Sequence, residues 1–558
     1  MNEVMTTAQR RLIERSAWTL VWLAILTTGV DAWGQWSQWP GMGVVSPLLV
    51  LVAITGATVL WSVREPSSPT LRNASLITSF ATVLLTQGAS IASRHLYTTD
   101  SAAFNQIATR LFLNGKDPYT ASFANAAQLL PTASNYWTYT VNGAHVTQIS
   151  YPAGSFLLQA PLMALGLNHL PTDWLDLAAW MVTIGLLYRI LPSPIRWLAP
   201  LLLLASAFVG DFANGGTDAL FIPFLIVAVW QWDRFVWSKR YTLGSWLSPV
   251  ALGVACSVKQ SPWFCVPFLL LGIGLEARAA HVNVPRTTLR YALITLATFL
   301  VINLPFIAWR PSAWLAGVLL PLHNPLVPDG QGLVTLALHG LTGGVELPLL
   351  SVAAALAAVA MLAAMYFWYP IWKRTWLFFL PVVLFIPGRS LSNYLLDFFP
   401  VAIVAAISVQ RAEPVVAPHW PMWTRRAIVS VPVIGAAAVA IVAFTSAPLT
   451  VTVDSVQAAS NGQAMQSVTI TVHNNSSRPV SPNCMIAFGG DHPSGFWRRS
   501  LNQGSLPLAP GSSATITLHP LRWTWAPPRA DYWLVEVYTS APSALSTSPL
   551  QRWNYGPW

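Results

Sequence analysis

Long apolar runs alternate with short polar segments through the first 450 residues of the chain. A helix needs about 20 mostly apolar residues to cross a bilayer. The pattern predicts thirteen membrane-spanning helices, over residues 16–33, 45–63, 74–92, 174–190, 194–210, 217–233, 243–257, 261–275, 290–308, 346–369, 375–388, 391–409 and 427–446. The fold class predicted for this part of the chain is therefore an all-α polytopic membrane protein.

Two further apolar stretches, 102–113 and 154–168, are too short to cross a bilayer. In the first, apolar side chains recur at helical spacing from Phe104 to Phe112, opposite a polar face. We interpret both stretches as helices on the membrane surface, within one long external loop over 93–173. A span at 154–168 would invert every later loop.

The pattern changes character at about residue 450. The segments VTVDSV, QSVTITVHNNSS, SSATITLHP and DYWLVEVYTS alternate apolar and polar residues at period two, between turns rich in Gly, Pro and Asn. This alternation is typical of strands with one buried face. It predicts a small β-sandwich of roughly 110 residues.

Charge fixes the expected orientation. The chain is 54% hydrophobic and 9% charged, with a formal net charge of +10. When the N-terminus is placed inside, 18 of the 30 Lys and Arg residues fall on the inner side, as the positive-inside rule requires. The basic composition therefore needs no nucleic-acid partner. We expect a multi-pass plasma-membrane protein with a cytoplasmic N-terminus and an extracytoplasmic C-terminal domain.

Polar side chains gather at the outer ends of the predicted helices. Taken singly, such groups are usually solvated helix ends, but here several converge on one side of the membrane. They are Asp100, Asp211, Asn214, Asp218, Lys259, Gln260, His323, Arg389 and Asn393, with Tyr119 and Tyr151 in the first external loop. A carboxylate or His can act as a general base, Lys or Arg can hold a phosphate, and aromatic side chains suit a sugar. The set suits transfer of a sugar from a phosphate-linked carrier.

The first external loop also resembles that of a known family. Asp100, Phe104, Gly115, Asp117, Pro118 and Tyr119 form D-x₃-F-x₁₀-G-x-D-P-Y, and Tyr151, Pro152 and Gly154 form a YP-x-G helix start. This pattern resembles membrane glycosyltransferases of the C superfamily, and most closely the polyprenyl-phosphate-mannose-dependent α-mannosyltransferases of mycobacterial glycolipid assembly. NGGTDALF, WDRFVWSKR and Lys259–Pro262 stand where that core has a polar turn, a basic inner loop and a K-x-x-P step.

The resemblance covers roughly 74–410 and implies a domain organisation. Residues 1–73 are an N-terminal tail with two extra spans, 74–410 the glycosyltransferase C-type core, 411–449 the last span and 450–558 the β-sandwich. The extra spans, the acids Asp211 and Asp218, and the β tail depart from the family pattern.

The resemblance implies an inverting hexosyltransferase that moves a mannose-like sugar from a polyprenyl-phosphate carrier to a lipid or glycan acceptor of the cell envelope. In this family the acid of the first external loop is the catalytic base, which implies that role for Asp100. Lys259 or Arg389 would hold the donor phosphate. We expect no cofactor and no metal, although Asp211 and Asp218 offer carboxylates to a divalent ion.

Two alternatives stay open at this point. A lipid or solute transporter would carry ionisable groups inside its spans, and Asp397 is the main one here. An envelope assembly scaffold would use the β-sandwich to bind a glycan or a partner, and would leave the Asp100 group without a role.

Overall fold

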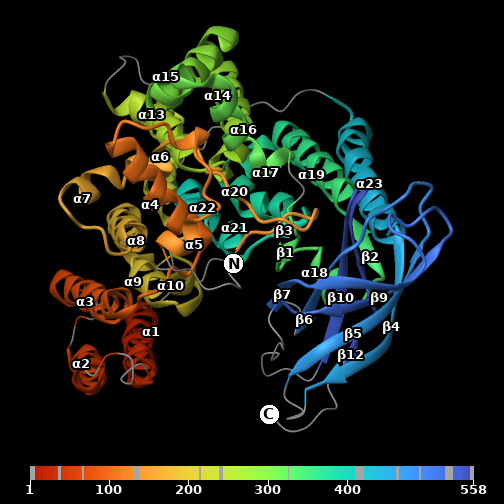
Figure 1. Cartoon of the computed structure of the whole chain (residues 1–558). Coiled ribbons are helices and arrows are strands. Elements are labelled where there is room, and N and C mark those ends of the chain that lie inside the picture. Colours follow the sequence, from red (N-terminus) through yellow and green to blue (C-terminus); the bar gives the residue numbers. More distant parts are fainter. Residues whose placement is uncertain are drawn as a thin grey trace.

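The fold is described from a computed structural model (Figure 1). The described residues run from 7 to 552, apart from 35–38, 40, 64, 66–67, 131–136, 213–214, 238–242, 324–325, 409–419, 460–463, 489–491 and 522–531.

Helices dominate the chain up to Thr445. Within the described residues, seven helical segments are long and apolar enough to cross a membrane: Met42–Ser62 (α2), Pro69–Ser93 (α3), Asp218–Trp237 (α11, Asp218–Val229, and α12, Arg234–Trp237), Ser261–Ala279 (the 3-10 turn Ser261–Cys265 and α14, Val266–Ala279), Val284–Trp309 (α15), Leu347–Phe367 (α19) and Met422–Thr445 (α23). An eighth is counted if α9 (Leu198–Leu204) and α10 (Ser206–Phe212), bent by 56°, form one broken span. The prediction of a helical membrane protein is confirmed, although these criteria do not give thirteen spans.

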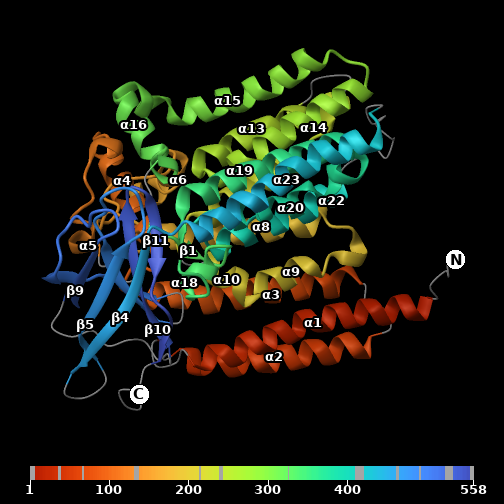
Figure 2. The same ribbon diagram turned by 90° about the vertical axis from the view of Figure 1, so that its right-hand side faces the viewer.

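Helices also occupy the other predicted spans. They are α1 (Thr7–Trp33), α8 (Pro171–Ile190), α13 (Leu243–Val258), α20 (Tyr369–Phe385), α21 (Ser392–Leu396) and α22 (Phe398–Ser408). The long helices run alongside one another, and the N-terminal end of α1 lies at the end of the bundle opposite the β-strands (Figure 2).

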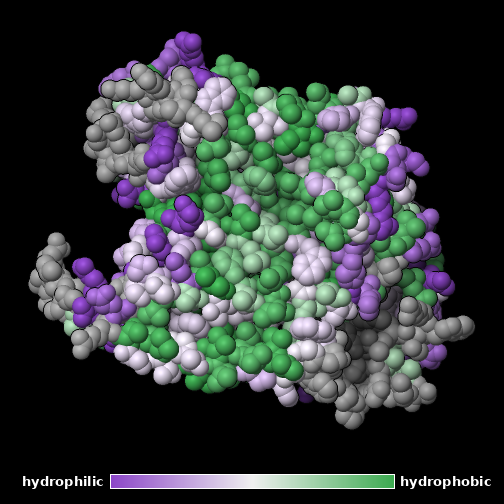
Figure 3. All heavy atoms as spheres, turned by 90° about the vertical axis from the view of Figure 1, so that its left-hand side faces the viewer, coloured by the Kyte–Doolittle hydropathy of each residue, from purple (hydrophilic) through white to green (hydrophobic). Residues whose placement is uncertain are grey.

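The surface of the bundle is unusually apolar. On the face shown in Figure 3, hydrophobic side chains cover the middle and hydrophilic ones gather toward the two ends. On α15 and α23, large apolar side chains such as Val301 (70% exposed) and Ile434 (66% exposed) point outward. A continuous apolar surface of this kind fits a bilayer and not water.

The segment between α3 and α8 differs from its prediction in one respect. It holds α4 (Asp100–Leu113), a short turn at Pro118–Thr120, α5 (Ala126–Leu129), α6 (Gly154–Leu157) and α7 (Ala160–Ala164). From Asp100 to Thr109 both faces of α4 are buried, including the polar face predicted to meet water. The side chains of Thr109 and Gln106 donate to the carbonyls of Phe156 (2.9 Å) and Asn168 (2.7 Å), so the polar face packs against protein.

Between α15 and α19 lie α16 (Pro311–Val318), α17 (Leu320–His323), β1 (Asp329–Gly330), α18 (Thr335–Leu338) and β2 (Gly344–Glu346). β1 pairs in parallel with β3 (Arg389–Ser390), which brings Asp329 opposite Arg389.

The C-terminal region forms two sheets. One has the order β4–β5–β9–β8, and the other β2–β11–β10–β6–β7, with β12 also on β10. The strands are β4 (Leu449–Ala458), β5 (Met465–Asn474), β6 (Asn483–Phe488), β7 (His492–Phe496), β8 (Arg498–Gln503), β9 (Ser513–His519), β10 (Tyr532–Ser540), β11 (Ser543–Thr547) and β12 (Gln551–Arg552). The four predicted strand segments match β4, β5, β9 and β10. The edge strand β2, however, comes from the helical part of the chain, just before α19.

Candidate functional site

Asp100 opens α4 beside a glycine-rich turn. The hydroxyl of the preceding residue, Thr99, accepts the N–H of Ala102 (3.1 Å) as a helix cap and donates to the carbonyl of Gly215 (3.1 Å). Asp100 is 8% exposed, and its Oδ2 accepts the backbone N–H of Thr138 at 2.8 Å. Burial raises the pKa of this carboxyl, and the Thr138 hydrogen bond and the charge of Arg389 oppose the rise.

The turn before α11 is held tightly against α4 and α8. Gly215 has a left-handed backbone (φ +71°), and a Cβ there would lie 2.7 Å from Oδ2 of Asp173. Thr217 is also left-handed (φ 63°), which is strained for a β-branched residue. Its N–H donates to Oδ2 of Asp176 at 3.1 Å. The packing and this hydrogen bond fix the direction in which Asp218 leaves the turn.

Asp218, Lys259 and Asn393 form a buried polar cluster. The Lys259 ammonium pairs with Oδ1 of Asp218 and also donates to the carbonyl of Gly216 (3.4 Å), while the Asn393 amide donates to Oδ2 of Asp218. Lys259 is 4% exposed and Asp218 is 1% exposed. Burial alone would lower the pKa of Lys259, but the adjacent Asp218 carboxylate outweighs it and the net pKa is raised. The two charges stabilise each other away from water.

Aromatic rings complete the surroundings of Lys259. Its Nζ lies 5.6 Å from the ring centre of Tyr151 and 5.2 Å from that of Tyr394, distances typical of cation–π contacts. Burial, the largest effect, raises the pKa of Tyr151 to about 12, so the phenol stays protonated near neutral pH.

Arg389 is held more loosely than Lys259. One guanidinium nitrogen donates to the carbonyl of Val327 at 3.4 Å, and another lies 3.8 Å from Oδ2 of Asp329. Their side chains are 21% and 50% exposed, so this long and partly solvated ion pair contributes little to stability.

Comparison of the chain with models of protein families, with curated proteins and with solved structures gave no match.

Other predicted site residues have structural partners. Gln260 donates to the carbonyls of Ser150 (2.7 Å) and Val318 (2.8 Å) and so ties two outer loops together. Tyr119 is 5% exposed and donates to the carbonyl of Tyr151 at 2.8 Å. Asp211 accepts the hydroxyl of Ser392 at 3.1 Å.

Two predictions cannot be placed in full. His323 is the last residue of α17, but its side chain lies outside the described part of the chain, as does the whole of Asn214. The structure therefore brings Asp218, Lys259, Asn393 and Tyr151 together. Asp100 lies beside the same turn, through Thr99 and Gly215, and within reach of the charge of Arg389.

Sequence reasoning missed two acids beneath this site. Asp173 pairs with Arg94 at 2.9 Å, and Asp176 holds the turn through Thr217. The signal was present in PTDWLDL, where both acids sit on one face at the start of an apolar helix. Acids near the start of a helix are so often solvated helix ends that the pattern alone did not single them out. Asp397, noted in the sequence, is fully buried, and neither of its carboxylate oxygens has a hydrogen-bond partner among the described residues.

Within the described residues, no group of three or more His, Cys, Asp or Glu side chains is arranged to hold a metal ion.

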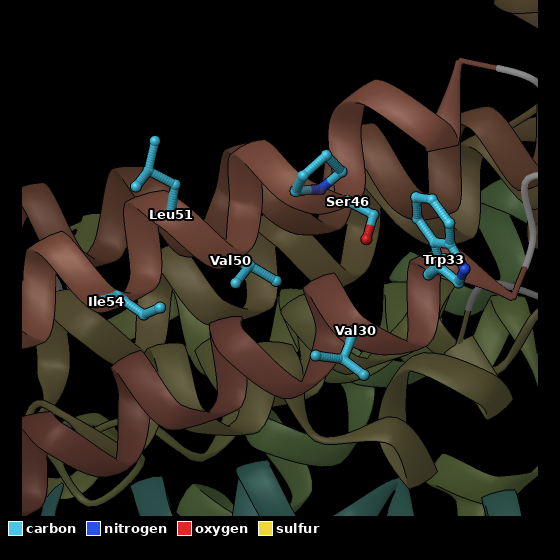
Figure 4. A pocket seen from close by; sticks show the side chains of 7 residues that line it. Val30, Trp33, Ser46, Val50, Leu51 and Ile54 are labelled. Carbon is cyan, nitrogen blue, oxygen red and sulfur yellow. The ribbon is translucent and has the colours of Figure 1, made fainter.

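An open groove of about 630 Å³ lies between α1 and α2, lined by Val30, Trp33, Ser46, Pro47, Val50, Leu51 and Ile54 (Figure 4). It has no titratable side chain and shares no residue with the cluster around Asp100.

Proposed function

We propose that this protein is a membrane glycosyltransferase of the C type. It moves a mannose-like hexose from a polyprenyl-phosphate carrier to a lipid or glycan acceptor of the cell envelope, with inversion at the anomeric carbon. The observation that carries the proposal is the buried carboxylate of Asp100 within reach of the charge of Arg389, whose side chain is partly exposed.

The reaction needs one proton acceptor and one phosphate holder. Asp100 takes the proton of the acceptor hydroxyl, the acceptor oxygen bonds to the anomeric carbon, and the bond from that carbon to the carrier phosphate breaks. Polyprenyl phosphate leaves with the electron pair. A carboxyl whose pKa is raised by burial is a stronger base once ionised, which suits this role.

The cations differ in what they offer the leaving phosphate. Lys259 is neutralised by Asp218 and covered by Tyr151 and Tyr394, so it orders the turn at Gly215–Asp218. Arg389 pairs with Asp329 at a long 3.8 Å, and the Asp329 side chain is half exposed. We therefore assign the donor phosphate to Arg389 and a supporting role to Lys259.

The finer topology belongs to the same proposal. All thirteen helical segments cross the plasma membrane, the N-terminus is cytoplasmic, and the site and the C-terminal sheets face outward. The two sheets pack as a β-sandwich. Supporting this, one buried hydrophobic cluster contains Ile470 and Ile516 from one sheet and Ile486 and Val535 from the other.

The test is transfer by the purified protein. Detergent-solubilised protein is mixed with synthetic polyprenyl-phosphate [¹⁴C]mannose and with lipids from a strain that lacks this chain. We expect label to move into a lipid or glycan product and polyprenyl phosphate to be released, without any vesicle. Failure with mannose and with other polyprenyl-phosphate hexoses would reject the proposal, and uptake of label only into sealed vesicles would point to transport.

A further inference from the structure

The loop that bonds Asp100 is a small hairpin. Tyr139 and His145 form an antiparallel bridge, and the N–H of Val146 donates to the carbonyl of Thr138 at 2.8 Å. On the side of the site, the N–H of Thr138 reaches Asp100, and the carbonyl of Tyr139 accepts the N–H of Val327 at 2.9 Å. The carbonyl of Val327 also accepts a hydrogen bond from the Arg389 guanidinium. The hairpin over residues 137–146 thus contacts the surroundings of both proposed catalytic groups.

The same hairpin is anchored from the C-terminal sheets. The ring of Tyr139 meets that of Phe496 edge-on, with centroids 5.5 Å apart. The Asn483 amide donates to the carbonyl of Val141 at 3.1 Å. At Gly143 an added Cβ would lie 3.0 Å from Oδ1 of Asn483, so hairpin and sheet are in close contact.

The hairpin and the C-terminal sheet also share a buried hydrophobic core. One buried cluster joins Val141 of the hairpin and Val327 with residues of the C-terminal sheet. Its sheet members are Val345 of β2, Met485 of β6, Tyr538 of β10 and Leu545 of β11. β2, which belongs to the helical part of the chain, is an edge strand of this sheet, paired with β11. The sheet and the outer loops are therefore one packed unit, and displacing the sheet would expose this core.

We propose that the C-terminal sheets hold the catalytic base in place, with Asn483 and Phe496 as positioning residues that keep the Thr138 N–H on Asp100. This inference rests on the proposed function. A short loop without such anchors samples many conformations, and a single hydrogen bond does not repay the entropy of fixing it. The role of the sheets is thus to preorganise the site, and neither residue touches the substrate.

The consequence is a specific change in pH dependence. The Thr138 hydrogen bond favours the carboxylate form of Asp100, against burial. When the hairpin is released, the base becomes harder to ionise. The acid limb of kcat then moves to higher pH, and the rate recovers as pH rises.

The experiment uses the full-length protein with Asn483→Ala, with Phe496→Leu, which keeps apolar bulk, and with Thr515→Ala as a matched control. Thr515 lies on β9, where its hydroxyl forms a hydrogen bond with the hydroxyl of Thr471 at 3.1 Å. Amide hydrogen exchange of peptides that cover residues 137–146 measures the local stability of the hairpin and does not require a transfer assay. We expect roughly 3- to 10-fold faster exchange in the first two variants, as for one lost hydrogen bond, with β5 peptides unchanged.

Unchanged exchange and an unchanged acid limb in both variants would overturn the inference, as would an equal drop in kcat at every pH. If the unsubstituted protein transfers no sugar, the proposed function fails instead, and faster hairpin exchange in the variants would still show that the sheets hold this loop.

Discussion

The backbone N–H of Thr138 donates a 2.8 Å hydrogen bond to Oδ2 of Asp100, 38 positions earlier in the chain. This contact joins a helix start to a hairpin that packs on the C-terminal sheets. It places Asp100 between two opposing influences on its pKa: burial raises the pKa, and the hydrogen bond from Thr138 lowers it.

Removing one partner of the buried Asp218–Lys259 pair should be costly. Lys259→Met leaves a buried carboxylate without its cation, and we expect a loss of about 3–5 kcal/mol in the free energy of unfolding. Adding Asp218→Leu should restore part of this loss. The measurement is denaturation in detergent of both single variants and the double variant. A double variant less stable than Lys259→Met alone would contradict the account.

Arg389 should matter for the donor and little for stability. Its ion pair with Asp329 is long and half-exposed, so Arg389→Gln should change the free energy of unfolding by less than about 1 kcal/mol. Loss of a charge-assisted phosphate contact should lower kcat/KM for the polyprenyl-phosphate sugar by roughly 10- to 100-fold. Asp329→Asn is the matched control, with near-normal kinetics. Equal effects of the two changes would remove Arg389 as the phosphate holder.

Glu536 should make stability depend on pH. Burial raises its pKa from 4.5 to about 7, partly offset by a 2.7 Å hydrogen bond from Tyr538. Because the folded state holds the proton more tightly, stability is greatest below about pH 4.5 and falls as pH rises toward 7. Glu536→Gln mimics the protonated form and should remove this fall in stability, which is about 3–4 kcal/mol at about 1.4 kcal/mol per pKa unit. If the unfolding midpoints of the unsubstituted protein and of Glu536→Gln fall in parallel from pH 5 to 8, Glu536 is not the cause of the pH dependence.

The proposed orientation can be read with thiol labelling. The three native cysteines, Cys256, Cys265 and Cys484, are all buried, so background labelling should be low. A cysteine in place of exposed Lys116 should react with an impermeant reagent in intact cells, whereas one in place of exposed Arg286 should react only after permeabilisation. The reverse pattern would invert the topology.

Local patterns in the sequence predicted much of this fold. Apolar runs and period-two alternation located the helices and the strands β4, β5, β9 and β10, because both signals arise within a few residues. β2 could not be predicted in this way, since GVE becomes a strand only by pairing with β11, some 200 positions later. The buried polar face of α4 was missed for the same reason: Thr109 is satisfied by the carbonyl of Phe156, a partner remote in sequence.

The sequence indicated which polar residues form the site, but it did not indicate what each of them does there. Lys259, Asp218 and Asn393 were each singled out as polar groups at outer helix ends, and they do meet. That Asp218 neutralises Lys259, and that Asp176 holds Thr217, depends on helix packing that the sequence does not express. Thr138 was not singled out, because it acts through its backbone N–H, which every residue but proline carries.

The most direct test of the central claim is the turnover of Asp100→Asn with purified protein and saturating donor, measured across pH. The Asn side chain still accepts the Thr138 N–H but cannot take the acceptor proton. We predict normal folding and donor binding with a loss of about 10²–10⁴ in kcat. The acid limb, which we expect above the ordinary Asp pKa of 3.8 in the unsubstituted protein, should be absent. Asp117→Asn is the control, because Asp117 caps a turn by accepting the N–H of Tyr119 at 3.0 Å, which Asn can also do. Near-normal turnover by Asp100→Asn, with its acid limb intact, would contradict the account and remove Asp100 as the base.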